Sequence, residues 1–457
     1  MKIHLIYPNF KSRNAGGAQE PLGILSVASV LRKAGHEVCL TDMTFSKNIS
    51  VIDAYVKKVD VVGIGCSTPL FGKAVEILKR AKRINPHLFT IIGGPHATQD
   101  PEDALRQGFD VVVMGEAEKS MVDLLNCLDS TGDWRSLSGL AYLKDEELIQ
   151  TPRLEFVKDL NALPFVARDF IDQQKYIRRN GYASIFNTRG CPFRCLYCKP
   201  TVDRLFGNRP RTRSAENVAE EIEAIHKNYG VSKFYFKDDT LFLCGHEWFD
   251  NLRKEFNKRS LSIRWYCLGR VDQIDESLLK CMKAAGLEAI AFGIESGSQK
   301  ILDFYHKDVT LSQARMAFSL CRENNIMTHA YMMLGAPEET RGDLQKTLEL
   351  LKELQPHSCR FFITTPIPGN FLYDYAREKG MVNVRSYEEY DNAFNLIQGR
   401  LPMKLEHLTI QDIREYANKM KAAYFLGNIK RCLTQWSALT MALKHLRSTV
   451  NIMFNQL

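Results

Sequence analysis

Short apolar runs alternate with segments of helical period along residues 1–127. The intervening helical segments, Pro21–Ala34 and Phe71–Ile84 among them, carry apolar residues three and four positions apart. This alternation predicts a doubly wound parallel sheet with helices on both faces. The predicted strands are Lys2–Tyr7, Glu37–Thr41, Val61–Cys66, Leu88–Ile92 and Asp110–Met114.

A second series of six apolar runs, also separated by helical patterns, follows from residue 183. These runs predict six β/α units, and in β/α barrels the chemistry lies at the carboxyl ends of the strands. The predicted strands are Ala183–Asn187, Lys233–Lys237, Ser262–Leu268, Ala289–Ile294, Met327–Met333 and Cys359–Thr364.

Between and after the two series the pattern is irregular. Residues 128–176 contain prolines and a predicted hairpin, which indicates a linker. We therefore predict domains at 1–127 and 177–375, joined by this linker. Residues 376–457 form a helical C-terminal region, in which the segment after Gln411 has seven basic and two acidic residues. Basic helices of this kind can lie on a membrane surface or simply cap the barrel.

Composition narrows the class of protein. The 457 residues carry a formal net charge of +8, which permits anionic ligands but does not by itself indicate nucleic acid. No apolar stretch is long enough to cross a bilayer. Nine of the twelve cysteines are scattered through the chain, and its first residues resemble a strand rather than a secretory signal. These features predict a cytoplasmic protein with free thiols.

The remaining cysteines, Cys191, Cys195 and Cys198, form the pattern C-x3-C-x2-C. Three thiolates at this spacing can bind three irons of a cubic cluster and leave the fourth iron open, whereas electron-carrying clusters are usually closed by four cysteines. A zinc site is an alternative interpretation, as are three unrelated thiols. Zinc would require a fourth ligand, and the nearest candidates, His226 and Cys244, lie at no familiar spacing.

With Tyr197 before its last cysteine, the triplet resembles the signature of the radical S-adenosylmethionine (radical SAM) enzymes. The resemblance implies a partial (β/α)6 barrel, a [4Fe-4S] cluster and S-adenosylmethionine as cofactors. In that family the open iron chelates the methionine moiety, and an electron from the cluster then gives a 5′-deoxyadenosyl radical. The electron comes from a low-potential donor such as flavodoxin or ferredoxin.

Polar residues follow the predicted barrel strands in the order that this resemblance implies. Asp238 or Asp239 could accept hydrogen bonds from the methionine α-ammonium. Arg270 could bind the methionine carboxylate with its planar fork. Glu295 and Ser296 could hold ribose hydroxyls or the amino-acid end, and the turn after Leu334 resembles the family's Gly-x-Pro turn near the adenine.

The strand ends of the first unit carry glycines and hydroxyl residues that suit a phosphate-bearing ligand. Their order resembles the flavodoxin-like cobalamin-binding domain that precedes many radical SAM cores, which implies cobalamin as a further cofactor. No His follows the first strand in the pattern that ligates cobalt in other cobalamin proteins, and an empty domain is the alternative. The candidate residues are Gly65, Ser67, Thr68, Gly93, Gly94, His96, Gly115 and Glu116, with His96 expected at the nucleotide tail.

The combined resemblance is to cobalamin-dependent radical SAM methylases. It implies methylation of an unactivated carbon in a lipid, tetrapyrrole or natural-product substrate. Radical cyclisation or rearrangement is the second hypothesis, and a non-catalytic cobalamin- or redox-responsive binding protein is the third. A tRNA methylthiolase would require a further cysteine cluster and an RNA-binding barrel, and neither is seen in the sequence.

Overall fold

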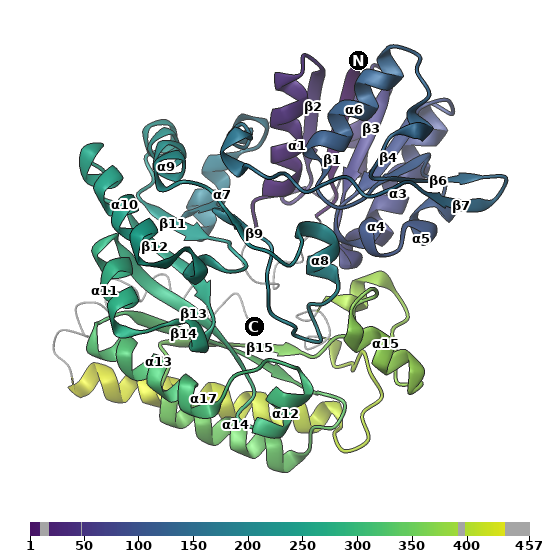
Figure 1. Cartoon of the computed structure of the whole chain (residues 1–457). Helices are drawn as coiled ribbons and strands as arrows, with labels where there is room; N and C mark the ends of the chain where they lie inside the picture. Colours follow the sequence, from purple (N-terminus) through teal and green to yellow (C-terminus); the bar gives the residue numbers. More distant parts are fainter. Residues whose placement is uncertain (10–17, 47, 392–397, 435–457) are drawn as a thin grey trace.

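The computed structural model describes residues 1–9, 18–46, 48–391 and 398–434. Two separate sheets organise the chain, one in each predicted α/β unit (Figure 1). The prediction of a doubly wound sheet followed by a partial barrel and a helical C-terminal region is confirmed. The last part of the predicted helical C-terminal region, residues 435–457, lies outside the described residues.

The first sheet has seven strands in the order β2-β1-β3-β4-β5-β6-β7. Strands β1 to β5 are parallel, and β6 and β7 form an antiparallel hairpin on the edge of β5. The first unit thus extends past residue 127 into the predicted linker, because β5 would otherwise present an unpaired edge. The bounds are β1 Lys2–Tyr7, β2 Glu37–Asp42, β3 Val61–Gly65, β4 Phe89–Gly93, β5 Val111–Val113, β6 Leu140–Lys144 and β7 Glu147–Gln150.

Helices cover both faces of this sheet because successive strand residues point in opposite directions. Leu5 belongs to the core formed with α1 (Leu22–Lys33) and α6 (Ala117–Asp129). Its neighbour Ile6 belongs to the core on the other face, formed with α3 (Phe71–Ile84). The shorter helices of the first unit are α2 Asp53–Val56, α4 Pro95–Gln99 and α5 Pro101–Arg106.

The second sheet is the partial barrel, with six parallel strands in the order β8-β11-β12-β13-β14-β15. Its bounds are β8 Ala183–Ile185, β11 Lys233–Phe236, β12 Arg264–Gly269, β13 Leu287–Glu295, β14 Met327–Leu334 and β15 Ser358–Ile363. Helices cover its outer side (Figure 1). They include α9 Ala215–Tyr229, α10 Gly245–Lys258, α11 Glu276–Ala284, α13 Leu311–Glu323 and α14 Arg341–Leu354, with α12 Gln299–Phe304 after β13.

Smaller elements surround the loop that carries the three cysteines. Strands β9 (Thr188–Arg189) and β10 (Arg211–Thr212) pair antiparallel on either side of it, and α8 (Thr201–Phe206) follows the third cysteine. The other helices are α7 Gln173–Asn180, α15 Phe371–Glu378 and α17 Ile410–Thr434, of which α17 packs along α14. No helix in the described ranges is long and apolar enough to span a membrane.

Buried polar contacts join the two units. The Glu20 carboxylate accepts hydrogen bonds from Gln173 Nε2 at 2.5 Å and from the backbone N–H of Ser184 in β8 at 2.6 Å. On another side, the Tyr387 hydroxyl donates to Asp103 of α5 at 2.7 Å. The Glu20 contacts therefore tie the first unit to β8 through buried groups that have no water as a substitute partner, whereas the Tyr387–Asp103 contact is only partly buried.

Candidate active site

The cysteine loop is held by backbone contacts from two sides. Leu196 N–H donates to the Tyr305 carbonyl at 2.9 Å, just after α12. At the start of α15, Phe371 N–H donates to the Lys199 carbonyl at 2.7 Å and Asn370 Nδ2 donates to the Tyr197 carbonyl at 3.0 Å. The loop conformation is thus fixed by elements that are distant in sequence.

The three thiols of the loop lie close enough to influence one another. Cys195 is buried, whereas Cys191 and Cys198 are half-buried. Burial raises the pKa of Cys198, and the Cys195 and Cys191 sulfurs raise it further. Neighbouring thiolates repel one another, so they require bound positive charge. The iron atoms of an iron–sulfur cluster supply that charge. This donor set fits the cluster.

Among the described residues, no three His, Cys, Asp or Glu side chains converge on a single metal ion. Three thiolates that bind three different irons of one cluster do not need to converge in that way.

Asp238 and Asp239 follow β11 and have different surroundings. Asp238 is 2% exposed, and its Oδ1 accepts hydrogen bonds from the backbone N–H groups of Asn187 (2.8 Å) and Thr188. Burial raises the pKa of Asp238 to about 7. Asp238 therefore fixes the backbone at Asn187 and Thr188, which leads into the cysteine loop. Asp239 is exposed, and it is the member of the pair that a ligand can reach.

Arg270, after β12, is directed to protein groups and not to open space. Its Nε and Nη2 donate to the Asp272 carboxylate at 2.9 and 3.1 Å, and Nη2 also donates to the Lys307 carbonyl at 2.6 Å. Its Nη1 lies 3.6 Å from Cys195 Sγ. The guanidinium thus has protein partners, and binding of the methionine carboxylate by Arg270 stays a prediction.

Glu295 ends β13 in a left-handed backbone conformation, with φ at +63°. Its Oε1 accepts hydrogen bonds from Lys307 Nζ at 2.8 Å and from the Tyr197 hydroxyl at 3.2 Å. Burial opposes the charge of Lys307, but Glu295 and then the Cys195 sulfur raise the pKa of its ammonium. Nothing in the sequence singles out Lys307 as a site residue, because it follows α12 in a turn that also contains other charged residues.

Ser296 lies on the helix side of the barrel. It is fully buried, and its Oγ lies 3.3 Å from Thr347 Oγ1 of α14. The neighbouring Gly297 N–H donates to the same hydroxyl at 2.9 Å. These contacts anchor the end of β13 to α14, and the expected role of Ser296 at a ribose or amino-acid group stays a prediction.

A buried carboxyl shapes the turn after β14. Glu339 Oε2 accepts hydrogen bonds from the N–H groups of Gly335 at 2.6 Å and Ala336 at 3.3 Å. Its other oxygen, Oε1, has no hydrogen-bond partner among the described residues. Burial raises the pKa of Glu339 to about 8. This residue lies two positions beyond the predicted Gly-x-Pro turn and was missed in the sequence.

The glycines of the first unit mostly permit close approach of protein segments. A Cβ at Gly94, where φ is +97°, would lie 2.7 Å from the Cys66 carbonyl oxygen. A Cβ at Gly93 would lie 3.3 Å from the Val113 carbonyl oxygen. At Gly115, φ is +74° and a Cβ would lie 3.3 Å from the carbonyl oxygen of Arg204 in α8. Gly115 therefore lets the carboxyl edge of the first sheet approach the helix after the cysteine loop.

His96 is enclosed by protein side chains. Its ring centroid lies 3.9 Å from that of Phe71, and its Nε2 lies 3.3 Å from Asp103 Oδ2. Tyr387, from the C-terminal region, packs edge-on against the imidazole. The expectation that His96 lies at the nucleotide tail stays a prediction.

Two further residues predicted to bind cobalamin are partly accessible at the carboxyl edge of the first sheet. Gly65 and Ser67 are half-buried at the end of β3, followed by the buried Thr68. A small recess on the same unit is lined by Thr98 of α4, by Met114 and Gly115 after β5, by residues 153–156 and by Arg204 of α8. The carboxyl edge predicted to bind cobalamin thus faces the segment that follows the third cysteine.

Glu116 belongs to a buried group of ion pairs that links the two units, which we call the Glu116–Arg189 clamp. It comprises Glu116, Glu118, Arg189 and Arg211. Arg211 donates to both oxygens of Glu116 at 2.8 and 2.9 Å. Arg189 donates to Glu116 at 3.0 Å and to Glu118 at 2.6 Å. Glu116 therefore holds the strands beside the cysteine loop, and its expected role in cofactor binding stays a prediction.

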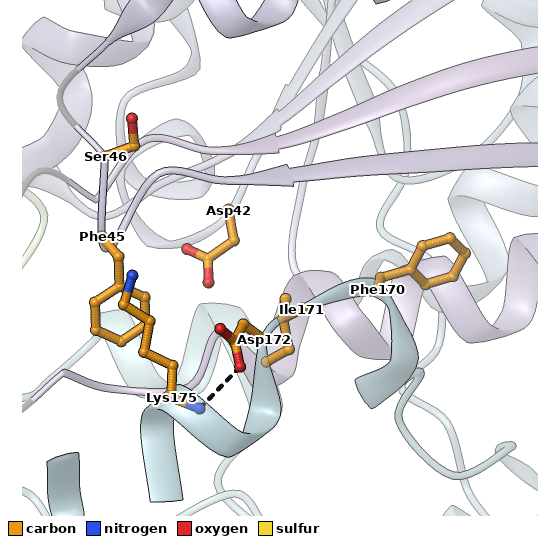
Figure 2. A pocket seen from close by; sticks show the side chains of 7 residues that line it. All are labelled: Asp42, Phe45, Ser46, Phe170, Ile171, Asp172 and Lys175. Atoms are coloured by element: carbon orange, nitrogen blue, oxygen red, sulfur yellow. Dashed lines mark hydrogen bonds between the residues drawn. The ribbon is translucent and has the colours of Figure 1, made fainter. Parts of the chain in front are cut away.

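A further pocket lies at the end of β2, away from every predicted site residue. It is lined by Asp42, Phe45, Ser46, Phe170, Ile171, Asp172 and Lys175 (Figure 2). Lys175 Nζ lies 4.6 Å from the ring centroid of Phe45, and Asp42 accepts a hydrogen bond from Tyr176 at 2.5 Å.

Known families match both units. The B12-binding domain matches residues 12–125, and the radical SAM superfamily matches residues 185–351. An uncharacterized methyltransferase of Pyrococcus horikoshii is 30% identical over 438 residues, covering 93% of each chain. The anaerobic magnesium-protoporphyrin IX monomethyl ester cyclase of Rubrivivax gelatinosus is 29% identical over 86% of this chain and 72% of the cyclase.

The fold has a close counterpart among solved structures. The radical SAM methyltransferase TsrM of Kitasatospora setae, in a structure with cobalamin and a [4Fe-4S] cluster, aligns with a TM-score of 0.73 at 17% identity. The alignment covers 92% of this chain and 88% of TsrM. The chain belongs to the family of radical SAM enzymes with a cobalamin-binding domain. Its cofactors are accordingly a [4Fe-4S] cluster, S-adenosylmethionine and cobalamin.

Proposed function

We propose that this enzyme methylates an unactivated carbon of a small-molecule substrate. When bound, the cluster and S-adenosylmethionine supply a hydrogen-abstracting radical, and cobalamin supplies a methyl group. The observation that carries the proposal is the junction between the units. Gln99 of α4 accepts a hydrogen bond from Arg204 of α8 at 2.7 Å, so the cobalamin-domain edge adjoins the helix after the third cysteine.

The protein's own residues hold and orient these groups. Cys191, Cys195 and Cys198 bind the cluster, and Asp239 receives the methionine α-ammonium. Glu295, with Lys307 and Tyr197, lies at the end of β13, where a ribose could be held. Gly65, Ser67 and Thr68 contact cobalamin at the end of β3. The Gly335–Ala336 turn, held by Glu339, borders the adenine.

The second candidate is radical cyclisation, which is favoured by the similarity to the magnesium-protoporphyrin ester cyclase. In that case the radical step is retained and no methyl group is transferred. The third, non-catalytic hypothesis predicts no cleavage of S-adenosylmethionine.

One assay separates the three hypotheses. Anaerobically reconstituted protein is incubated with hydroxocobalamin, a low-potential reductant and methyl-labelled S-adenosylmethionine. Methylation predicts 5′-deoxyadenosine, labelled methylcobalamin and S-adenosylhomocysteine together. Deoxyadenosine alone would favour cyclisation, and the absence of all three would revive the binding protein.

We further propose that the enzyme acts in the cytoplasm and receives its electron from flavodoxin or ferredoxin. The free thiols of the described residues support a reducing compartment. Peripheral membrane contact also remains a prediction. It is supported by Phe425, Leu426 and Ile429, which are exposed on α17.

A further inference from the structure

Four tyrosines gather on the inner side of the barrel sheet. We call this set, Tyr182, Tyr235, Tyr266 and Tyr331, the tyrosine face. The Tyr235 and Tyr266 rings stack with centroids 4.5 Å apart, and Tyr182 packs edge-on against both at 5.6 and 4.9 Å.

The tyrosine face is opposite the helix layer. Phe234, Phe236 and Trp265, which alternate with Tyr235 and Tyr266, are fully buried in the core formed with the helices. Strand residues alternate between faces, so the tyrosines point to the inner side of the sheet. They are half-buried there.

Arg360 of β15 lies beside this face and lacks a counter-charge. It is paired in register with Tyr331 of β14, and its charge acts on Tyr182, Tyr235 and His329. Among the described residues, none forms an ion pair or a hydrogen bond with its half-buried guanidinium.

Other arginines near the barrel sheet do have a counter-charge. Arg168, Arg213 and Arg270 each pair with a carboxylate. Withdrawing a guanidinium from water without a hydrogen-bond partner costs free energy. The absence of a carboxylate partner at Arg360 therefore requires an explanation.

Neighbouring side chains cannot provide the missing negative charge. Burial raises the pKa of Tyr182, Tyr235 and Tyr266, so these phenols remain protonated at neutral pH. Burial, followed by the charge of Arg360, lowers the pKa of His329 to about 4, which leaves that imidazole neutral. Among the described residues, Arg360 is therefore a positive charge without an ion-pair partner beside hydroxyl groups and aromatic rings, and Lys237 Nζ lies 5.7 Å from the Tyr235 ring centroid.

The position of Arg360 along β15 also indicates how far a ligand bound to it would have to extend to reach the carboxyl ends of the strands. It precedes the last residue of β15, Ile363, by three positions. At about 3.3 Å per residue, the backbone of Arg360 lies roughly 10 Å along the strand from its carboxyl end. In register, Gly293 of β13 lies at the level of Tyr331 and Arg360, and the side chains of Glu295 and Lys307 lie beside it.

We propose that Arg360 and the tyrosine face bind the substrate as an amphiphilic organic anion. A carboxylate or phosphate group pairs with Arg360, an apolar or conjugated body lies against the tyrosine rings, and the reacting carbon lies about 10 Å from the anionic group at the strand ends. This inference rests on the proposed function and names the substrate class of the same site.

The test compares charged and uncharged probes on the full-length, cluster-reconstituted protein. Equilibrium dialysis measures binding of protoporphyrin IX against its dimethyl ester, and of hexadecyl phosphate against hexadecanol. We expect at least one anion to bind about tenfold or more tightly than its neutral partner, because a charge-assisted hydrogen bond is gained. The pair with the larger preference distinguishes a carboxylate from a phosphate.

Arg360→Gln should remove the preference for the anion and leave binding of the neutral probe unchanged. Arg264→Gln is the matched control, because that arginine lies near the start of β12 and already pairs with Glu288; the preference should persist. Equal binding of charged and neutral probes by the wild type would overturn the proposal without any variant. A preference that survives Arg360→Gln would also overturn it.

Failure of the proposed function has a different signature. It appears as missing methylcobalamin in the substrate-free assay, with or without 5′-deoxyadenosine, whatever the dialysis result. The two conclusions can therefore fail independently.

Discussion

At the scale of single residues, the site is defined by charges around the cysteines. Arg270 is directed to Cys195 Sγ, and Lys307 is held by Glu295 and Tyr197. Both cations lie beside the thiolates that would carry the negative charge of a cluster. They stabilise that charge electrostatically, and the effect is strengthened because Lys307 is buried.

Arg270→Gln should make the cluster harder to reduce, because the reduced cluster loses a neighbouring positive charge. We expect a reduction potential more negative by on the order of 50 mV, measured by a redox titration followed by electron paramagnetic resonance. Arg194→Gln is the control, since Arg194 lies in the same loop but is exposed to solvent. An unchanged potential in Arg270→Gln would contradict this role.

Glu339 gives the stability of the fold a pH dependence. Its carboxyl ionises near pH 4.5 when unfolded, and burial raises its pKa to about 8 in the folded protein. Between these values the folded state binds more protons than the unfolded state, so stability falls as pH rises. The slope from this residue is at most about 1.4 kcal/mol per pH unit.

In Glu339→Gln this component should disappear. Denaturation midpoints measured across the range should therefore fall less steeply with rising pH than those of the wild type. Parallel curves for the two proteins would exclude the buried carboxyl as the source. Asp238, whose pKa is also raised, contributes a similar slope to both proteins and does not obscure the difference.

At the scale of elements, the Glu116–Arg189 clamp connects the β5 end to the strands beside the cysteine loop. Arg189 and both glutamates are buried. Arg189→Gln leaves two carboxylates short of a partner, and breaking a buried pair in this way costs about 3–5 kcal/mol. A lower thermal midpoint and loss of methylcobalamin relative to 5′-deoxyadenosine should follow.

Arg32→Gln provides the matched control for the clamp. The Arg32–Asp169 pair has the same 2.6 Å separation as the Arg189–Glu118 pair but is exposed, so its loss should cost about 0–1 kcal/mol. Equal midpoints for the two variants would show that the clamp contributes no more than a surface ion pair.

The strands could be predicted from the sequence, whereas some contacts between elements could not. Hydrophobic periodicity predicted the parallel strands of both sheets because each strand carries its own apolar run. The clamp was not predicted, since Glu116 and Arg189 are 73 positions apart and both look solvated in the sequence. The same holds for Lys307, and for Arg360, whose significance depends on which residues are absent around it.

On the whole-molecule scale, the two units form one site through their shared boundary. Gly115 approaches α8, Gln99 contacts Arg204, and the C-terminal Tyr387 covers His96. The motif order in the sequence indicated that both units were present. Their contact could not be read from it, because the glycines and polar residues of the first unit satisfy the same pattern whether they approach a cofactor or another protein segment.

The central claim is that the loop of Cys191, Cys195 and Cys198 drives cleavage of S-adenosylmethionine in a chain that also methylates cobalamin. The most direct measurement is 5′-deoxyadenosine and methylcobalamin from a single anaerobic sample, in wild type, Cys195→Ala and the control Cys281→Ala. We predict both products from the wild type and the control, and no 5′-deoxyadenosine or bound cluster iron in Cys195→Ala. Deoxyadenosine formation by Cys195→Ala would contradict the account.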